Sequence, residues 1–536
     1  MSTDVESNKE KNDLLIQKVE SLNSNQAHVD EKDADATLKF LEQYGDKVTE
    51  DITPTIEKKI RRKLYIWLVP LLMTINTMLF LDKSVLSYGI LLGLFESTGI
   101  SHKQYNDLNS IFYAGYFFGQ IPLHFFLQKF NFAKFVSLIL FSWAILIFLT
   151  ATANNYGGLI VLRFLLGFFE SIVIPAIEIT LLQFFTPKER ASINPLFWIS
   201  SQGPTEILGG FISYGLLHLK NPVTPPWKLF MVIVGGLTLL NATWSFFIYP
   251  SNPSDAKFLT IEERVHLIRK IQHATHSSIE QKTIKKHQII ETIKDPLTWL
   301  FTSFGLLSMI HNNIMFQANI LYEAIGVERL GITLIGVVGG CFGSVYLLSG
   351  VFLIRFLKEG QLIAILYAGI PALAASLGMV LIPWDKSIPL IAMLLLTRTF
   401  ALAFIVVVGW STSSASGYTK KFYRNIFFMF GYCVANVISP QIWTEGKGNE
   451  SPRYYTAWSI QIVISFFIPL VIAVIIHVIL KKRNNERLKY IEENPDAQYG
   501  QVVVTDPNTG EQVIEKVEIA NLDLTDLENK TFIYPL

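Results

Sequence analysis

Residues 457–480 read AWSIQIVISFFIPLVIAVIIHVIL, a stretch of 24 residues without Asp, Glu, Lys or Arg. About 20 apolar residues in a helix cross the hydrocarbon core of a bilayer, and lipid cannot satisfy a bare backbone. This stretch is therefore predicted to be a transmembrane helix. Eleven comparable stretches precede it, and the predicted helices cover about residues 64–88, 106–127, 132–152, 156–182, 192–217, 227–249, 297–322, 330–356, 361–382, 388–412, 423–443 and 457–480.

A charged segment, residues 250–296, divides the predicted helices into six and six. Two sets of six spans around a polar linker are typical of secondary transporters built from parallel repeats. We expect an all-α membrane protein with twelve transmembrane helices in two six-helix bundles. Its expected parts are a largely disordered N-terminal tail (1–63), a first bundle (64–249), a central loop (250–296), a second bundle (297–480) and a C-terminal tail (481–536).

Basic residues alternate between the connections of the predicted helices. They are dense at 58–63, 420–424 and 481–483, whereas the connection at 154–157 has none. By the positive-inside rule both termini and the central loop are predicted to be cytoplasmic. The N-terminus is polar and acidic and shows no signal peptide, although Asp33–Tyr44 could form a short helix. We expect a multi-pass protein of the plasma membrane, with the endoplasmic reticulum or vacuole membrane as the alternative.

The bulk composition excludes several classes of protein. Only 17% of the residues are charged, below the roughly 25% of soluble domains, and the net charge of +1 argues against a nucleic-acid partner. The sequence contains neither an HxxxH nor an HExxH spacing, so we expect no enzyme, metal or cofactor. Cys341 and Cys433 lie in apolar spans and are predicted to be packing residues rather than a disulfide.

Ionisable side chains inside predicted spans are the strongest candidates for function, because burying a charge in a membrane is costly. Cationic and amide groups could bind a substrate, and buried carboxyls could carry a proton. The substrate candidates are Lys83, Arg163, Arg398, Asn312 and Asn313, and the proton-coupling candidates are Asp82, Glu170 and Glu206. Each of these residues could instead have a purely structural role, since charged groups also pair between helices and asparagines also join helices by hydrogen bonds.

One pair of arginines suggests an anion site. If the two halves repeat, the fourth and tenth predicted helices correspond, which places Arg163 and Arg398 at similar depth. Two guanidinium groups facing one cavity would bind an anion or a carboxylate, because each offers a planar pair of donors. Arg163 and Glu170 are seven residues apart and should share one face of their helix.

Several motifs resemble a known family. Residues 163–171, RFLLGFFES, followed by Pro175 resemble the fourth-helix signature of the major facilitator superfamily. Further stretches resemble its fungal allantoate permease branch, the anion:cation symporters: Asp82-Lys83, Pro250–Pro253, Ser416–Lys421, Ser439–Gln441 and Asp523–Asn529. The resemblance implies a proton-coupled importer of allantoate, a carboxylate vitamin such as nicotinate or pantothenate, a sulfonate or an amino acid.

Loop and tail sequences narrow the expected substrate. Residues 277–282, 383–386, 413–421 and 532–536 resemble cysteine-transporting members, so cysteine is our first expectation. The loop at 128–134, QKFNFAK, departs from the glycine-rich acidic pattern of the superfamily, which puts the usual gate of that loop in doubt. The expected partners are a small substrate, protons and the lipid bilayer, and the expected state is a monomer. A nutrient sensor that does not transport and an exporter remain alternatives; rings of like residues, which a channel would need, are absent from the sequence.

Overall fold

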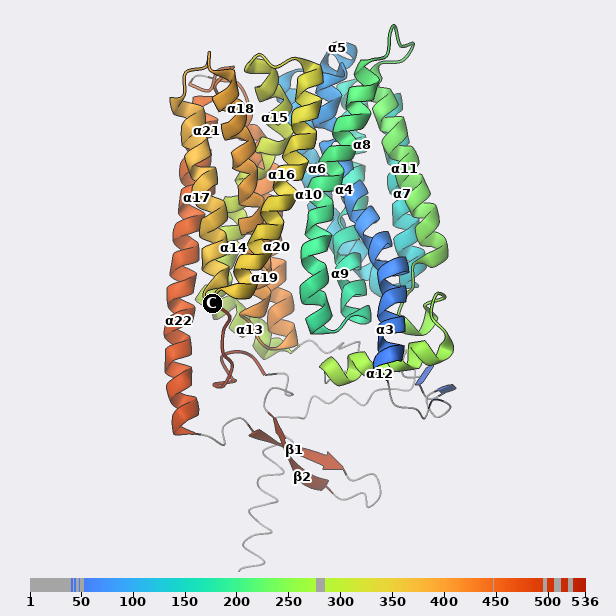
Figure 1. Cartoon of the computed structure of the whole chain (residues 1–536), viewed down its shortest axis with the longest axis vertical. Helices are drawn as coiled ribbons and strands as arrows, with labels where there is room; N and C mark the ends of the chain where they lie inside the picture. The colour runs from blue at the N-terminus through green and yellow to red at the C-terminus, as the bar shows by residue number, and fades with distance from the viewer. Residues whose placement is uncertain are drawn as a thin grey trace, which may run out of the picture.

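The computed structural model describes residues 40–41, 43–44, 48, 53–275, 285–446, 448–494, 499–505, 512–518 and 524–536. The disorder predicted for the N-terminal tail, most of the predicted helix at 33–44 and the stretch 277–282 lie outside these residues. Helices occupy all twelve predicted positions and run roughly parallel to the long axis of the molecule (Figure 1). Within the described residues, nine helices are long and apolar enough to cross a membrane.

The first half of the chain supplies one group of helices. Its first span is continuous from Pro54 to Leu91 and is capped at its start by Thr53, whose side chain accepts from the Ile56 N–H. The elements are α3 (Pro54–Lys63), η3 (Leu64–Leu68), α4 (Val69–Leu91), α5 (Leu94–Thr98), α6 (His102–Lys129), α7 (Phe132–Thr152), α8 (Tyr156–Glu170), α9 (Val173–Phe184), α10 (Pro187–Leu217) and α11 (Pro226–Ile248).

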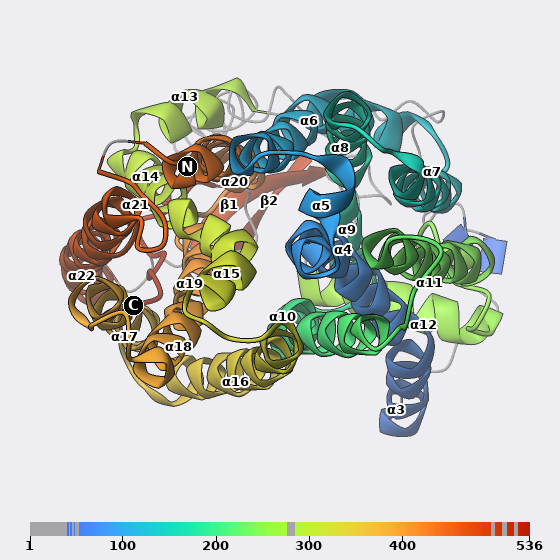
Figure 2. The same cartoon turned by 90° about the horizontal axis from the view of Figure 1, so that it is seen from above.

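The second half supplies the other group, and Figure 2 shows the two groups on opposite sides of the view along the helices. The elements are α14 (Pro296–Met309), η5 (Ile310–Asn312), α15 (Asn313–Ala324), α16 (Arg329–Phe356), α17 (Gly360–Leu381), α18 (Ser387–Leu396), η6 (Thr397–Thr399), α19 (Phe400–Ser413), α20 (Tyr418–Ile438), η7 (Ser439–Trp443), α21 (Tyr455–Ile460), η8 (Gln461–Phe467) and α22 (Ile468–Glu493). The last helix continues well past the predicted end at residue 480.

Prolines explain why several predicted helices are interrupted. A proline ring clashes with the carbonyl four residues earlier and removes one hydrogen bond from the helix. The fourth predicted helix breaks between α8 and α9, and the residue four before Pro175 is Ser171, which lies in the break. The wide turns of η3 and η8 likewise lie just before Pro70 and Pro469.

Glycines allow α6 and α8 to cross in backbone contact. A Cβ atom at Gly167 would overlap the carbonyl of Phe112, and one at Gly115 would overlap the carbonyl of Phe164. Small residues are the usual means by which membrane helices approach closely.

Replacing Gly167 by leucine is therefore expected to separate α6 from α8 and to lower stability by about 3 kcal/mol or more. Thermal unfolding of the purified protein in detergent measures the effect. Gly236→Leu on α11 is the matched control, because a Cβ atom there meets nothing within 4 Å. Equal melting temperatures for Gly167→Leu and the unmodified protein would contradict the close contact between α6 and α8.

The two halves are joined mainly toward the end of the molecule that carries α5, called here the α5 face. Tyr105 OH donates to the Phe316 carbonyl at 3.0 Å, and Gln317 Nε2 donates to Asn106 Oδ1 at 2.7 Å. Along the sides, α10 packs on α16 and α6 packs on α20 (Figure 2). The halves are thus joined by hydrogen bonds at the α5 face and by helix packing along the sides.

The opposite end, called here the α12 face, carries the linker between the halves. The linker forms η4 (Pro253–Asp255), α12 (Ile261–Thr275) and α13 (Lys286–Lys294), and α3 and the end of α22 lie on the same face (Figure 1). Lys63 in α3 pairs with Glu263 in α12 at 2.6 Å. Beyond α22 the chain forms an antiparallel pair of strands that was not predicted, β1 (Tyr499–Thr505) and β2 (Gln512–Glu518).

Candidate functional site

Four charged side chains come together inside the first half. Asp82 and Lys83 belong to α4, and Arg163 and Glu170 belong to α8, where a spacing of seven residues puts both on the face that turns inward. None of the four residues is more than 4% exposed. We call Asp82, Lys83, Arg163 and Glu170 the N-half cluster.

The charges of the N-half cluster balance, with two cations and two carboxyls. Lys83 interacts electrostatically with Glu170 and Asp82, and Arg163 interacts with the same two carboxyls. Trp143 Nε1 on α7 lies 3.5 Å from Asp82 Oδ2 and donates to it. The positions found for these side chains agree with the prediction that Arg163 and Glu170 share a face.

Several groups of the cluster have no direct hydrogen-bond partner among the described residues. They are Lys83 Nζ, Arg163 Nε and both carboxyl oxygens of Glu170. Leaving a buried charged group without hydrogen bonds costs several kcal/mol, so a protein rarely keeps one without a use. Lys83 and Arg163 can donate further hydrogen bonds, and Glu170, which lies close to Asp82, can accept them.

Aromatic rings surround the ammonium group of Lys83. Its Nζ atom lies 4.8 Å from the centre of the Phe80 ring and 5.6 Å from that of Tyr116. Cys433 of α20 also interacts with Lys83 electrostatically, which brings the second half of the chain to the cluster. Cys433 is buried, as predicted for a packing residue, whereas Cys341 is exposed.

A second group of polar residues lies where the two halves meet. Arg398 in η6 approaches Glu206 of α10, with 3.6 Å between Arg398 NH1 and Glu206 Oε2. Tyr88 OH donates to the same Glu206 oxygen at 3.0 Å, and Tyr322 interacts electrostatically with both charged groups. A Cβ atom at Gly339 would lie 3.1 Å from the guanidinium of Arg398, so this glycine leaves room for it.

The two asparagines predicted to bind substrate differ in their surroundings. Asn312 Nδ2 donates to Asn436 Oδ1 at 2.7 Å and to Tyr113 OH at 3.1 Å. Asn312 therefore joins helices by hydrogen bonds, which was the alternative to a role in binding substrate. Both polar atoms of the Asn313 side chain are buried and have no partner among the described residues. Asn313 begins α15 directly after the short turn η5, and of the two asparagines it is the one whose amide makes no hydrogen bond among the described residues.

Arg163 and Arg398 do not share contacts in this structure. Arg163 interacts with Asp82 and Glu170, whereas Arg398 pairs with Glu206. The sequence also did not indicate Tyr88, Trp143 or Tyr116. Aromatic residues make up 13% of the chain, so residue type alone could not select these three.

Two groups of helices, with buried charges inside the first and an ion pair where the two meet, are typical of a secondary transporter. Residues 72–440 match the Major Facilitator Superfamily, and the chain belongs to this family. It is 42% identical to the high affinity cysteine transporter of Saccharomyces cerevisiae over 511 aligned residues. The alignment covers 94% of this chain and 95% of that protein. The allantoate permease of the same yeast is 28% identical, over 97% of this chain and 94% of that protein.

Solved structures support the fold. A D-xylose–proton symporter superposes with a TM-score of 0.57 at 12% identity, over 76% of this chain and 96% of that one. An inward-facing bacterial homologue of the human lysosomal transporter Spinster superposes with a TM-score of 0.53 at 14% identity, over 79% and 96%. The predicted superfamily, its allantoate permease branch and the all-helical transporter fold are confirmed.

Proposed function

We propose that this chain imports cysteine together with protons across the plasma membrane. The observation that carries the proposal is the N-half cluster, which offers unpartnered groups of both signs. An amino acid has a carboxylate for Lys83 and Arg163 and an ammonium group for a carboxyl, whereas a simple carboxylate would use only the cations. The similarity to a cysteine transporter over nearly the whole chain points to the same substrate.

The surroundings of Lys83 suit the side chain of cysteine. The rings of Phe80 and Tyr116 lie beside the ammonium group that would hold the substrate carboxylate. Sulfur packs favourably against aromatic rings, by about 0.3–1.5 kcal/mol per contact. We therefore infer that a thiol side chain would lie against these rings.

Glu170 is our first choice for the proton site. It is fully buried, its oxygens lack hydrogen-bond partners among the described residues, and Asp82 is a neighbouring carboxyl. A neutral carboxyl is far less costly to bury than a charged one, so a proton can enter from an acidic exterior. Departure of the proton restores the carboxylate beside Lys83 and Arg163.

We infer that the α12 face is cytoplasmic, as the basic connections predict. On that assignment the contacts on the α5 face, including Tyr105 with Phe316, close the external end of the interface. Such a conformation would release its substrate to the cytoplasm. We expect the protein to be a monomer.

Uptake of radiolabelled cysteine tests the proposal in cells that lack their own carrier, at acidic and neutral external pH. We expect acid-stimulated accumulation that unlabelled cysteine competes better than allantoate, nicotinate or a sulfonate. Competition by those anions alone would support the alternative substrates, and binding without accumulation would indicate a sensor. Efflux from preloaded cells without uptake would indicate an exporter.

The Glu206–Arg398 pair gives a separate prediction about the movement of the two halves. Because the pair connects α10 to η6 across the interface, Arg398→Gln should leave Glu206 buried without its cation and slow transport about tenfold. Initial uptake rates, normalised to protein at the cell surface, measure the effect. Exchanging the charges in Glu206→Arg with Arg398→Glu should restore part of the rate, and an unchanged rate in Arg398→Gln would contradict this role.

A further inference from the structure

The last residues of the chain return to the second half and are held there by specific contacts. Asn484 of α22 makes two hydrogen bonds with the backbone of Tyr534, donating to its carbonyl at 2.9 Å and accepting from its N–H at 2.8 Å. Trp410 Nε1 of α19 donates to the Pro535 carbonyl at 2.8 Å. Tyr534 is only 2% exposed, so the segment 524–536 packs as part of the body.

Ion pairs connect this segment with the linker and with α20. The buried Lys420 contacts three carboxylates at once: Asp526 at 2.8 Å, Glu291 at 2.7 Å and Asp295 at 3.1 Å. Arg424 pairs with Asp295 at 2.7 Å. Burial would raise the pKa of Asp295, but the neighbouring cations outweigh it and hold that pKa below its ordinary value. Lys420 and Arg424 lie at the surface that residues 524–536 occupy, called here the seat, and both are thus already matched by carboxylates.

Thr525 lies at the point where added negative charge would have the largest effect. Its side chain is fully buried, and its hydroxyl donates to Glu291 Oε2 at 2.8 Å. The same hydroxyl accepts from the Glu528 N–H at 3.1 Å, while Glu528 Oε2 accepts from the Thr525 N–H at 2.9 Å. The hydroxyl of Thr525 therefore points at one carboxylate and lies beside another.

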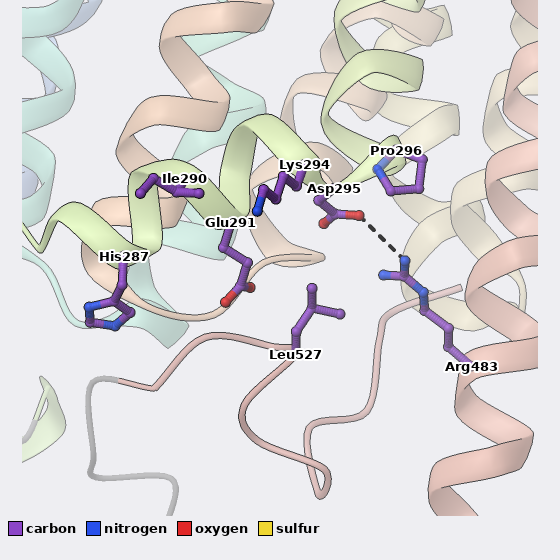
Figure 3. A pocket seen from close by; sticks show the side chains of 8 residues that line it. All are labelled: His287, Ile290, Glu291, Lys294, Asp295, Pro296, Arg483 and Leu527. Atoms are coloured by element: carbon purple, nitrogen blue, oxygen red, sulfur yellow. Dashed lines mark hydrogen bonds and ion pairs between the residues drawn. The ribbon is translucent and has the colours of Figure 1, made fainter. Parts of the chain in front are cut away.

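The seat is open on one side. A cavity of about 370 Å³ lies between α13, the start of α14 and α22, and Leu527 of the tail lines it (Figure 3). Figure 3 shows Glu291 turned toward Leu527 of the tail, and Asp295 turned toward Arg483 of α22. Leu527 is 42% exposed beside this cavity, so solvent reaches the edge of the seat.

We propose that residues 524–536 form a detachable latch on α13, α20 and α22, and that phosphorylation of Thr525 keeps the latch detached. A phosphate carries about −1.5 to −2 charges at neutral pH and would face Glu291 and Glu528. Lys420 and Arg424 are already engaged by carboxylates, and Arg487 already donates to the Asp526 carbonyl and to Tyr534 OH, so a phosphate would have to displace existing contacts to gain a cation. This inference does not depend on which substrate the protein carries.

The modification acts on the detached tail, because Thr525 is buried when the latch is seated. A protein kinase of the acid-directed class would transfer the terminal phosphoryl group of ATP to Thr525 Oγ1. An O–P bond forms at Thr525, the bond to the β-phosphate of ATP breaks, ADP leaves and the hydroxyl proton is released. The acidic residues at 526 and 528 give Thr525 the surroundings that such a kinase selects.

Hydrogen exchange of the full-length protein in detergent tests the latch directly. We expect slow exchange at the amides of Asn529 and Tyr534, which are hydrogen-bonded when the latch is seated, and exchange at least about tenfold faster in Thr525→Glu. Thr525→Val removes the hydroxyl and its bonds to Glu291 and the Glu528 N–H without adding charge, so it should accelerate exchange much less than Thr525→Glu does. Thr531→Glu is a second control, because the Thr531 hydroxyl contacts only Asn529 among the described residues.

Three outcomes would overturn the latch: fast exchange in the unmodified protein, slow exchange in Thr525→Glu, or equal acceleration in Thr525→Glu and Thr525→Val. Treatment of the full chain with an acid-directed kinase and ATP tests the modification. Phosphate should enter Thr525 about tenfold faster in Tyr534→Ala, which unseats the latch, than in the unmodified protein. Equal rates would contradict the protective role of the seat, and no phosphate on Thr525 in Tyr534→Ala would exclude the site.

Discussion

Replacing Lys83 by glutamine is expected to reduce cysteine uptake at least about 100-fold in protein that still reaches the plasma membrane. The ammonium group of Lys83 is buried and lacks a hydrogen-bond partner among the described residues, and in our proposal it donates to the substrate carboxylate. A hydrogen bond to a charged group contributes about 1.5–3 kcal/mol, and the loss of a nearby opposite charge adds to this. A change of about 2.7 kcal/mol corresponds to a factor of 100.

The measurement is the initial rate of radiolabelled cysteine uptake, divided by the amount of protein at the cell surface. Lys358→Gln provides the matched control, because Lys358 is exposed in the turn between α16 and α17. Lys83→Arg keeps the charge in a larger group and should retain part of the activity at a higher KM. Full uptake by Lys83→Gln would remove Lys83 from the binding site.

The positions of the helices could be predicted because apolar composition is a local property of the sequence. The stretch predicted at 132–152 coincides with α7, and each other predicted span coincides with one or more observed helices. The turns η5 and η6 could not be predicted in the same way. They depend on how neighbouring helices pack, and no proline follows them within the next four residues.

The sequence also indicated much of the N-half cluster, because Arg163 and Glu170 share a helix face through their spacing alone. It could not show that Asp82 and Lys83 lie against that face, since α4 and α8 are far apart in the chain. For the same reason, the sequence could not show which side chain pairs with Arg398. A repeat argument placed it opposite Arg163, whereas the structure pairs it with Glu206, a contact between α10 and η6 that no local pattern records.

The return of the C-terminal tail is a further contact that composition does not indicate. Residues 524–536 mix polar and apolar side chains, and this composition does not place them in the structure, yet Asp526 is fully buried against Lys420. Buried charges require partners, and here the partners come from α13, α20 and the tail. Only the folded chain brings these three segments together.

Replacing Glu170 by glutamine is expected to separate substrate movement from proton movement. Glutamine keeps the shape and polarity of the side chain but can neither lose nor gain a proton, so the site should resemble a permanently protonated carboxyl. Accumulation of cysteine against its gradient at acidic external pH should fall at least about tenfold. Exchange of labelled for unlabelled cysteine across the membrane needs no net proton flux and should continue.

Two further substitutions identify which carboxyl carries the proton. If Glu170 does so, Glu206→Gln should lower the rate of uptake but keep its stimulation by acid, because Glu206 pairs with Arg398 at the interface of the halves. Asp82→Asn should weaken both accumulation and binding, since Asp82 interacts electrostatically with both Lys83 and Arg163. Loss of acid stimulation in Glu206→Gln, with stimulation intact in Glu170→Gln, would move the proton site to the interface. In that case the substrate would bind in the first half, and the proton that drives transport would bind at the interface between the two halves.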